Sequence, residues 1–141
     1  MRCGASRLLQ RATTRTLDLM SADIARFRYT RSEPQGPYEY KDAEAWGRFV
    51  RYIELGDDSY AMRQVDEYEN GYLSRYDRRH WDDQFGTLAN FRFGQAWIQH
   101  WGEPTVITHA EFEEKWMRAG SSPAMALKRS SSDAPPPWVK A

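Results

Sequence analysis

Three side chains that could take part in catalysis lie within four residues of one another. The stretch His-Trp-Asp-Asp places His80 just before the pair Asp82 and Asp83. A histidine can act as a general base near neutral pH, and paired carboxylates can hold a metal ion that activates water. This pattern is compatible with a metal-dependent hydrolase, but adjacent aspartates are also common in turns. No second motif supports the catalytic interpretation, so we favour the turn.

The other residues with catalytic potential are isolated. His100 and His109 have no partner at a suggestive spacing, and His109 stands at the expected start of a helix. Cys3 is the single cysteine, which excludes an internal disulfide and a cysteine zinc cluster. The chain also has no glycine-rich phosphate loop and no nucleophile motif. We therefore expect no catalytic residue, no metal and no cofactor.

A second kind of chemistry, peptide recognition, is suggested by Thr-Leu-Asp-Leu-Met at residues 16–20. Two leucines and a methionine around one aspartate can anchor an extended peptide in a partner's apolar groove. The same residues could end an organellar targeting helix, because residues 1–16 hold four arginines and no acid. They could also be translated upstream sequence, with Met20 as the true start. The arginine-, alanine- and aspartate-rich composition favours a bacterial protein over an organellar one.

The charges are unevenly distributed along a chain whose formal net charge is zero. Residues 1–32 hold seven arginines against two aspartates, whereas residues 33–119 hold ten basic and seventeen acidic residues. A basic segment on an acidic body indicates an N-terminus that acts separately. The acidic body argues against direct nucleic-acid binding, and no apolar run approaches the roughly 18 residues that span a membrane. We expect a cytoplasmic bacterial protein.

These features divide the chain of 141 residues into three parts. We expect residues 1–37 to be a basic mobile leader and linker, because residues 32–37 contain two prolines and a glycine. Residues 38–120 are expected to form a single domain. The serine-, proline- and alanine-rich residues 121–141 are expected to be a disordered tail.

Local patterns predict the elements that must position any site. Residues 47–56 read as a strand, and residues 60–77 as a hairpin turning at Asn70-Gly71. A two-residue loop there would pair Asp66 with Arg75 and Val65 with Tyr76. A loop over 78–91 leads to a second ring-rich strand region at 91–101.

Residues 108–120 predict a helix with a capping box of Thr108 and Glu111, and with Gly120 as its stop. Phe112 and Trp116 would face the core, and Glu111–Lys115 and Glu114–Arg118 would form ion pairs on the exposed side. Together these elements predict an α+β fold. It would be a small antiparallel sheet of about four or five strands with one packed C-terminal helix.

The region from about Val50 to Trp116 resembles a family of small bacterial domains of uncharacterised function. The residues that carry the resemblance are Tyr52-Ile53-Glu54-Leu55, Arg63-Gln64-Val65-Asp66, Glu69-Asn70-Gly71, Tyr76-Asp77, Asp83, Gly86, Leu88, Glu111-Phe112-Glu113 and Trp116. The resemblance implies no catalytic residues. The chain also resembles a toxin of a toxin–antitoxin system, and this toxin blocks DNA replication by binding the DNA polymerase sliding clamp. That toxin is restrained by an antitoxin that delivers it to the ClpXP protease.

Clamp-binding peptides of bacteria are similar to Gln-Leu-Asp/Ser-Leu-Phe, and two segments of this chain can be compared with them. Leu17, Asp18 and Leu19 match the middle positions, while Thr16 replaces the glutamine and Met20 replaces the aromatic ring. The second candidate is Gln84, Leu88 and Phe91, whose spacing from glutamine to leucine is one residue too long.

Three functions remain open at this stage. The first is a non-enzymatic toxin that binds the sliding clamp through Leu17, Asp18, Leu19 and Met20. The second is an immunity or antitoxin-like protein whose acidic domain masks a basic toxin. The third is a metal-dependent hydrolase using His80, Asp82 and Asp83.

Overall fold

The structure, a computed structural model, describes residues 24–33, 40–128 and 136–138. Its centre is a five-stranded antiparallel sheet with the strand order β4-β3-β2-β1-β7. The strands are β1 (Tyr29–Ser32), β2 (Phe49–Leu55), β3 (Ala61–Tyr68), β4 (Leu73–Asp77) and β7 (Thr105–Val106). This arrangement confirms the predicted α+β class and the strand expected at residues 47–56.

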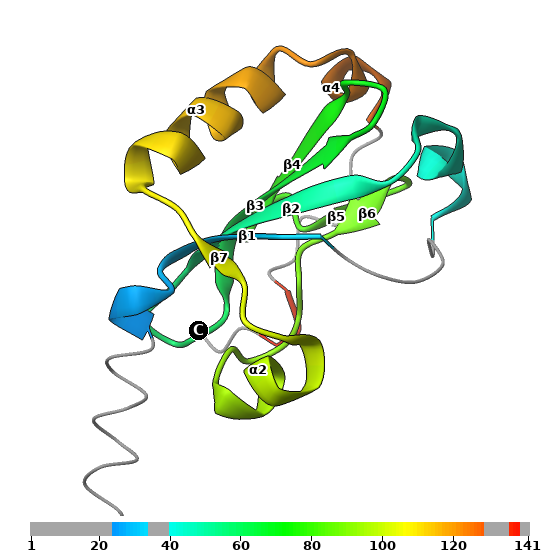
Figure 1. Ribbon diagram of the computed structural model, residues 1–141. Coiled ribbons are helices and arrows are strands. Elements are labelled where there is room, and N and C mark those ends of the chain that lie inside the picture. The colour runs from blue at the N-terminus through cyan, green and yellow to red at the C-terminus, as the bar shows by residue number, and fades with distance from the viewer. Residues whose placement is uncertain (1–23, 34–39, 129–135, 139–141) are drawn as a thin grey trace, which may run out of the picture.

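Both faces of the sheet are covered, as Figure 1 shows. Helix α3 (His109–Gly120) lies on one face, where Phe112 packs against Tyr52 and Val65. The segment from β4 to β7 covers the other face and contains β5 (Asp82–Asp83), β6 (Gly86–Thr87) and α2 (Gln95–Trp101). Because side chains alternate along a strand, each central strand supplies core residues to both faces.

The hairpin between β3 and β4 forms where it was predicted, but the predicted pairing is wrong by one residue. Asp66 pairs with Ser74 and Val65 with Arg75. The loop has three residues instead of two: Gly71 alone has a positive φ, of 90°, and its amide donates to Tyr68 O at 2.9 Å. This is a turn followed by a left-handed glycine, the common three-residue hairpin loop.

The one-residue shift changes which side chains meet, because it moves every β4 side chain to the opposite face relative to β3. The expected ion pair between Asp66 and Arg75 does not form. Asp66 instead pairs with Arg51 of β2, at 2.9 Å. Arg75 lies on the other face, where its guanidinium stacks on Trp116 at 4.8 Å from the ring centroid.

The strand predicted at residues 91–101 is also wrong, because residues 95–101 form helix α2. Short ring-rich stretches do not distinguish a strand from a buried helix. Tertiary contacts decide here: Phe93 and Trp97 stand four residues apart and their rings contact each other at 5.2 Å. Both pack on the core formed by Phe27, Ile53 and Leu88.

Helix α3 begins as predicted, since Thr108 Oγ1 accepts a hydrogen bond from the Glu111 amide at 3.1 Å. Phe112 is fully buried, and Trp116 packs against the same cluster. The role predicted for Gly120 is wrong. It is the last residue of the helix, and a Cβ there would lie 2.9 Å from the Arg75 guanidinium. Gly120 is needed because it leaves room for the Arg75 guanidinium, and not because the backbone is left-handed there.

The folded part extends beyond the boundaries expected at residues 38 and 120. Strand β1 precedes the first boundary, yet it lies inside the sheet between β2 and β7. After the second boundary, α4 (Pro123–Leu127) packs on β4, and Trp138 contacts Trp81 at a centroid distance of 5.3 Å. A short 3-10 helix, η1 (Lys41–Trp46), lies before β2.

Candidate functional site

Of the residues in the predicted hydrolase motif, Asp83 is the one placed in a defined polar site. Its Oδ1 atom accepts three hydrogen bonds, from the Tyr76 hydroxyl at 2.9 Å and from the amides of Phe85 at 2.8 Å and Gly86 at 3.1 Å. Its Oδ2 atom pairs with Lys128 Nζ at 2.9 Å. With both oxygens engaged, Asp83 anchors the β5–β6 turn on the sheet.

His80 and Asp82 do not join Asp83 around a common point. His80 is exposed and lies in the turn after β4, where its carbonyl accepts the Asp77 amide. Asp82 pairs with Thr87 in the short β5–β6 ladder. Among the described residues, no group of three histidine, cysteine, aspartate or glutamate side chains could hold a metal ion. The turn interpretation therefore fits Asp83, whose carboxylate accepts from the amides of the β5–β6 turn, whereas Asp82 lies in the ladder.

Lys128 is a cation whose side chain is only 14% exposed, although the sequence assigned it to a disordered tail. Its ammonium group donates to Arg75 O at 2.7 Å, pairs with Asp83 and lies 4.0 Å from the centroid of the Tyr76 ring. Burial lowers the pKa of Lys128, against the opposing effect of Asp83. One local signal could have found this element: Ser122-Pro123 matches the N-cap and N1 preferences of a helix.

A second buried carboxylate, Asp66, lies on the same face of the sheet. Arg51 donates to both of its oxygens, at 2.9 and 3.2 Å, and Gln64 Nε2 contacts them at 3.3 and 3.2 Å. Gln64 also donates to Thr87 O and accepts from the Ala89 amide. This side chain therefore holds the chain after β6 against the sheet.

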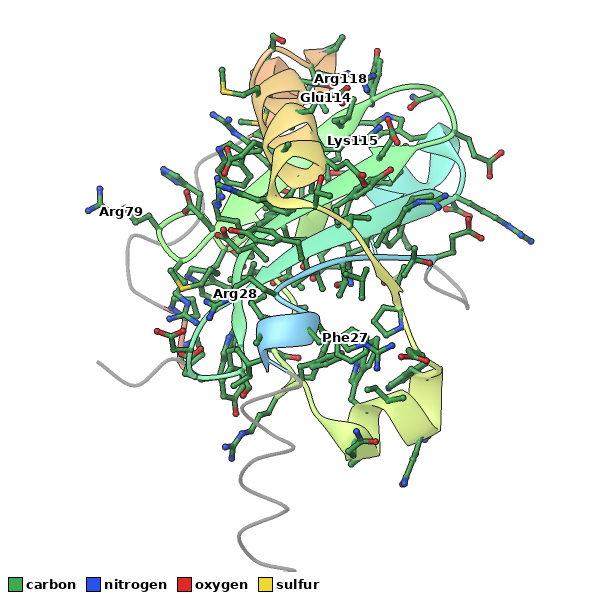
Figure 2. The ribbon with its side chains drawn as sticks, turned by 60° about the vertical axis from the view of Figure 1, so that its left-hand side comes forward. Phe27, Arg28, Arg79, Glu114, Lys115 and Arg118 are labelled. Atoms are coloured by element: carbon green, nitrogen blue, oxygen red, sulfur yellow. The ribbon has the colours of Figure 1, made fainter. Side chains whose placement is uncertain are left out.

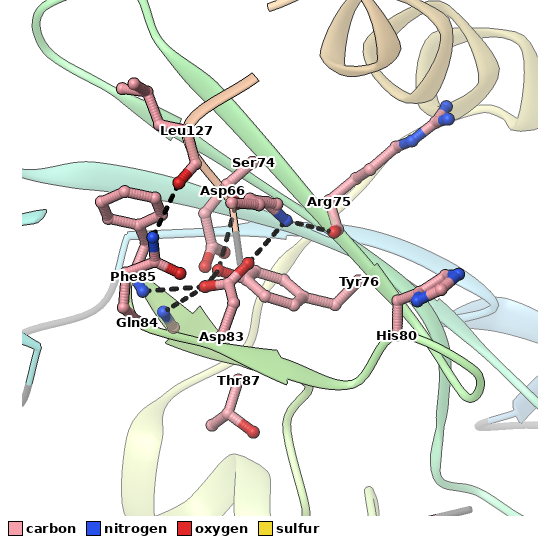
Figure 3. Close-up of polar contacts among 12 residues, drawn as sticks. Asp66, Ser74, Arg75, Tyr76, His80, Asp83, Gln84, Phe85, Thr87 and Leu127 are labelled. Carbon is pink, nitrogen blue, oxygen red and sulfur yellow. Dashed lines mark hydrogen bonds and ion pairs between the residues drawn. The ribbon is translucent and has the colours of Figure 1, made fainter. Parts of the chain in front are cut away.

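The two carboxylates belong to one set of residues, which we call the buried polar layer. Its members are the buried residues Gln64, Asp66, Ser74 and Tyr76, together with Arg51, Asp83 and Lys128, whose side chains are 23%, 4% and 14% exposed. Ser74 Oγ donates to the Tyr76 hydroxyl at 3.0 Å, and this hydroxyl donates in turn to Asp83. Figure 3 shows these contacts, with Tyr76 between Ser74 and Asp83.

Within the buried polar layer, Tyr76 is held in its protonated form. Burial, together with the charges of Asp83 and Asp66, raises the pKa of Tyr76 far above its ordinary value. Among the described residues, the one buried side-chain polar atom without a partner is Trp138 Nε1, which lies outside this layer. A fully paired network of this kind rigidifies a core and specifies its packing. The layer is therefore a scaffold that joins the chain after β4 to the sheet.

The opposite face carries a ladder of rings and cations beneath α3. The Arg63 guanidinium lies 4.9 Å from the Phe112 ring and 5.0 Å from the Trp116 ring. It also pairs with Glu54 at 2.7 Å and with Glu113. These partners fix Arg63 between the sheet and the helix.

On the outer side of α3, one of the two expected ion pairs forms. Glu114 and Arg118 form the predicted pair at 3.7 Å. Lys115 does not reach Glu111 and instead crosses to Glu67 of β3, at 3.0 Å. Figure 2 shows these α3 side chains at one end of the molecule, and Arg79 projecting outward from the turn after β4.

The first clamp-binding candidate, Leu17, Asp18, Leu19 and Met20, lies outside the described residues. The second candidate is built into the domain. Leu88 is fully buried in the core, Gln84 Nε2 donates to Leu127 O at 2.8 Å, and Phe91 stacks on Trp97 at 5.0 Å. These three side chains do not form one open surface, and Leu88 could enter a partner's groove only by leaving the core.

Large apolar side chains do reach the surface elsewhere. Met117 on α3 is 70% exposed and Trp101 at the end of α2 is 64% exposed. Val106 on the edge strand β7 and Leu127 on α4 are exposed as well. Tryptophan is enriched among the residues that anchor protein partners, and methionine is enriched in protein interfaces.

Within the described ranges, none of the helices combines the length and the apolar character needed to cross a membrane. Comparisons with protein-family models, with curated proteins and with solved structures each found no match.

Proposed function

We propose that this chain is a non-enzymatic bacterial interaction protein, and specifically a toxin that occupies the peptide groove of the DNA polymerase sliding clamp. The observation that supports a non-enzymatic role is that both carboxylate oxygens of Asp83 already have partners. Its partners are the Tyr76 hydroxyl, two backbone amides and Lys128. Asp83, the strongest candidate for a catalytic carboxylate, thus has a structural role. Binding of a protein partner is therefore better supported than catalysis.

The clamp-binding part of the proposal rests on Leu17, Asp18, Leu19 and Met20. Leu17 and Leu19 would enter the groove as apolar anchors, Met20 would fill the place of the usual ring, and the extended backbone would supply hydrogen bonds. The burial of Leu88 disfavours the second segment as an alternative peptide. Bound in this way, the chain would exclude polymerases and repair proteins by competition, without chemistry.

Because glutamine and the aromatic ring are replaced, we expect moderate affinity, with a Kd of about a micromolar or somewhat tighter, near −8 kcal/mol. By the resemblance described above, further partners would be an antitoxin and the ClpXP protease, in the bacterial cytoplasm.

The test is calorimetric titration of the full chain into the sliding clamp of the organism that encodes it. Leu17→Ala/Leu19→Ala should weaken binding by about tenfold or more, because truncating two buried anchors removes more than about 1.4 kcal/mol. A matched control is Val106→Ala/Met117→Ala, which truncates two exposed apolar residues of the domain. The control should bind like the unaltered chain.

A third variant, Gln84→Ala/Phe91→Ala, examines the second segment without emptying the Leu88 site. Loss of binding in this variant alone would move the peptide to residues 84–91. No binding by the unaltered chain would reject the clamp proposal.

The acidic domain supports a second candidate, an immunity or antitoxin-like protein that masks a basic toxin. The seventeen acidic residues against ten basic ones in residues 33–119 favour a cationic partner. Recovery of a basic toxin in a salt-sensitive complex, together with no affinity for the clamp, would establish this function instead.

A further inference from the structure

Residues 136–138, with the sequence Pro-Pro-Trp, pack on the folded domain, although the sequence assigns them to a disordered tail. We call them the proline–tryptophan segment. Pro136 is fully buried, and Trp138 packs against the core on the side of the sheet that α2 covers. The Trp138 ring meets the Trp81 ring edge to face, at a centroid distance of 5.3 Å. Figure 1 shows the segment, in red, on the side of the sheet opposite α3.

The proline–tryptophan segment has the chemistry of a proline-rich peptide ligand. Pro136 and Pro137 have no backbone N–H group, so the segment cannot extend the sheet as an ordinary strand. Proteins bind such segments on surfaces lined by aromatic rings, where the preset backbone of proline reduces the entropy lost on binding. Here the ring on the domain is Trp81, and it contacts a side chain two residues after the buried proline. The ligand that fits is therefore a proline followed two positions later by a large apolar ring.

The domain holds its own side of this contact in place. The Trp81 carbonyl accepts a hydrogen bond from the Leu88 amide at 2.6 Å and another from Thr87 Oγ1 at 3.0 Å. Leu88 is fully buried, and Thr87 belongs to β6. These contacts fix Trp81 beside the β5–β6 pair without help from residues 136–138. The site should therefore persist when the proline–tryptophan segment leaves it.

The proline–tryptophan segment fills this site incompletely. Trp138 Nε1 is buried and has no hydrogen-bond partner among the described residues. Removing an N–H group from water without supplying an acceptor opposes binding. The site thus recognises the apolar ring and not its N–H group, and a ligand with a ring that lacks this group would avoid the loss.

We propose that the surface around Trp81 is a binding site for a proline-rich segment of a partner protein, with a large apolar ring two residues after the proline. Residues 136–138 occupy this site in the absence of the partner and compete with it. The site is separate from residues 17–20, so its test does not depend on binding to the sliding clamp.

The experiment uses as its probe the peptide Ala-Pro-Pro-Pro-Trp-Val-Lys-Ala, which has the sequence of residues 134–141. Two further peptides carry phenylalanine or alanine in place of the tryptophan. Each is titrated by calorimetry into the full-length Trp138→Ala variant, whose site is emptied, and into the unaltered chain. A matched control variant is Trp101→Ala, which removes a tryptophan that is 64% exposed at the end of α2. Circular dichroism checks the fold of each variant.

Trp138→Ala should bind the tryptophan peptide about tenfold or more tightly than the unaltered chain does. In the unaltered chain, residues 136–138 compete at an effective concentration on the order of a millimolar. The phenylalanine peptide should bind Trp138→Ala within about fivefold of the tryptophan peptide, because the smaller ring buries less area but leaves no N–H group unpaired. The alanine peptide should not bind. Trp101→Ala should behave like the unaltered chain.

Nuclear magnetic resonance then locates the bound peptide on the Trp138→Ala variant. The indole N–H signal of Trp81 should shift on binding, because the ring of the peptide lies against it. The indole signal of Trp101 should stay in place. A shift of Trp101 without a shift of Trp81 would overturn the proposal.

The proposal also fails if folded Trp138→Ala binds neither aromatic peptide, or if it binds them no more tightly than the unaltered chain. Dimers of the unaltered chain that Trp138→Ala does not form, detected by sedimentation, would show that a second copy supplies the ligand and not a separate partner. If Trp138→Ala does not fold alone, the tryptophan peptide should restore its fold, because a ligand stabilises the folded state that it binds. A variant that stays unfolded with excess peptide would reject the site.

Discussion

At the scale of single residues, two buried carboxylates determine how the chain after β4 is attached to the sheet. Asp66 is 1% exposed, and Asp83 has a side chain that is 4% exposed. A buried charge without partners would be strongly destabilising, so each carboxylate depends on a cation and on neutral donors. Asp83, which resembles a catalytic residue in the sequence, is a framework residue in the structure.

We predict that Asp66→Asn lowers the free energy of unfolding by about 3 kcal/mol or more. The substitution keeps the volume but removes the charge opposite Arg51 and places an amide donor where two donors already converge. Urea unfolding followed by tryptophan fluorescence measures the change.

A matched control is Asp57→Asn, which removes a carboxylate that pairs with Arg28 but is 94% exposed. This change should leave stability almost unaltered, because exposed ion pairs contribute little. Equal effects of the two substitutions would contradict a structural role for Asp66.

At the scale of elements, the β3–β4 hairpin depends on one glycine. Gly71 has a φ of 90°, and no atom lies within 4 Å of the place where its Cβ would be. The amide of Gly71 closes the turn to Tyr68, and Asn70 Oδ1 accepts from the Tyr72 amide at 3.0 Å. The loop thereby sets the register between β3 and β4. In this register Asp66 is buried, and the apolar side chains on both faces of the sheet stay in the core.

Gly71→Ala should therefore cost about 1–2 kcal/mol, because a Cβ makes the left-handed backbone unfavourable. Gly94→Ala is a closely matched control: its surroundings are equally open, but its φ of 170° is extended backbone that alanine also adopts. Thermal unfolding of the two variants should show a lower Tm for Gly71→Ala only. A lowered Tm for Gly94→Ala of the same size would contradict the backbone explanation.

At the scale of the whole molecule, arginines connect distant parts of the chain through carboxylates. Burial alone would raise the pKa of Glu54, but the hydrogen bonds from Arg63 outweigh it and lower that pKa. Arg63 likewise lowers the pKa of Glu113 on α3. Against the effect of burial, Arg78 lowers the pKa of Asp58 in the turn between β2 and β3.

These shifts predict that the protein loses stability in acid. A carboxyl group with a lowered pKa in the folded state stabilises the fold fully above its unfolded pKa, which is 4.5 for a glutamate. That contribution disappears as the pH falls from this value through the folded pKa. We expect the free energy of unfolding, measured in urea from pH 7 to pH 3, to decrease below about pH 5.

Arg63→Gln should make this acid dependence shallower and should lower stability at pH 7, because it removes the cation that Glu54 and Glu113 share. Arg26→Gln breaks an exposed pair with Glu103 and serves as the control. An unchanged slope in Arg63→Gln would show that other carboxyl groups cause the acid sensitivity.

Local sequence was enough to predict the features whose signals lie within a few residues. The start of α3 follows from Thr108 and Glu111, its buried side from Phe112 and Trp116, and the hairpin from Asn70-Gly71. The α+β class follows from these elements, because an amphipathic helix and alternating strands must bury their apolar sides together.

Tertiary contacts decided the rest, since they join residues far apart in the chain. The register of β4, the helix at residues 95–101 and the packing of α4 depend on burial against segments that no local pattern identifies. Asp83 and Lys128 are separated by 45 positions and meet only when α4 packs on β4 and Asp83 accepts the hydrogen bond from Tyr76 of β4. A motif that resembles a catalytic site in the sequence becomes part of the scaffold for this reason: burial, hydrogen bonding and charge pairing act on the folded neighbourhood of a side chain.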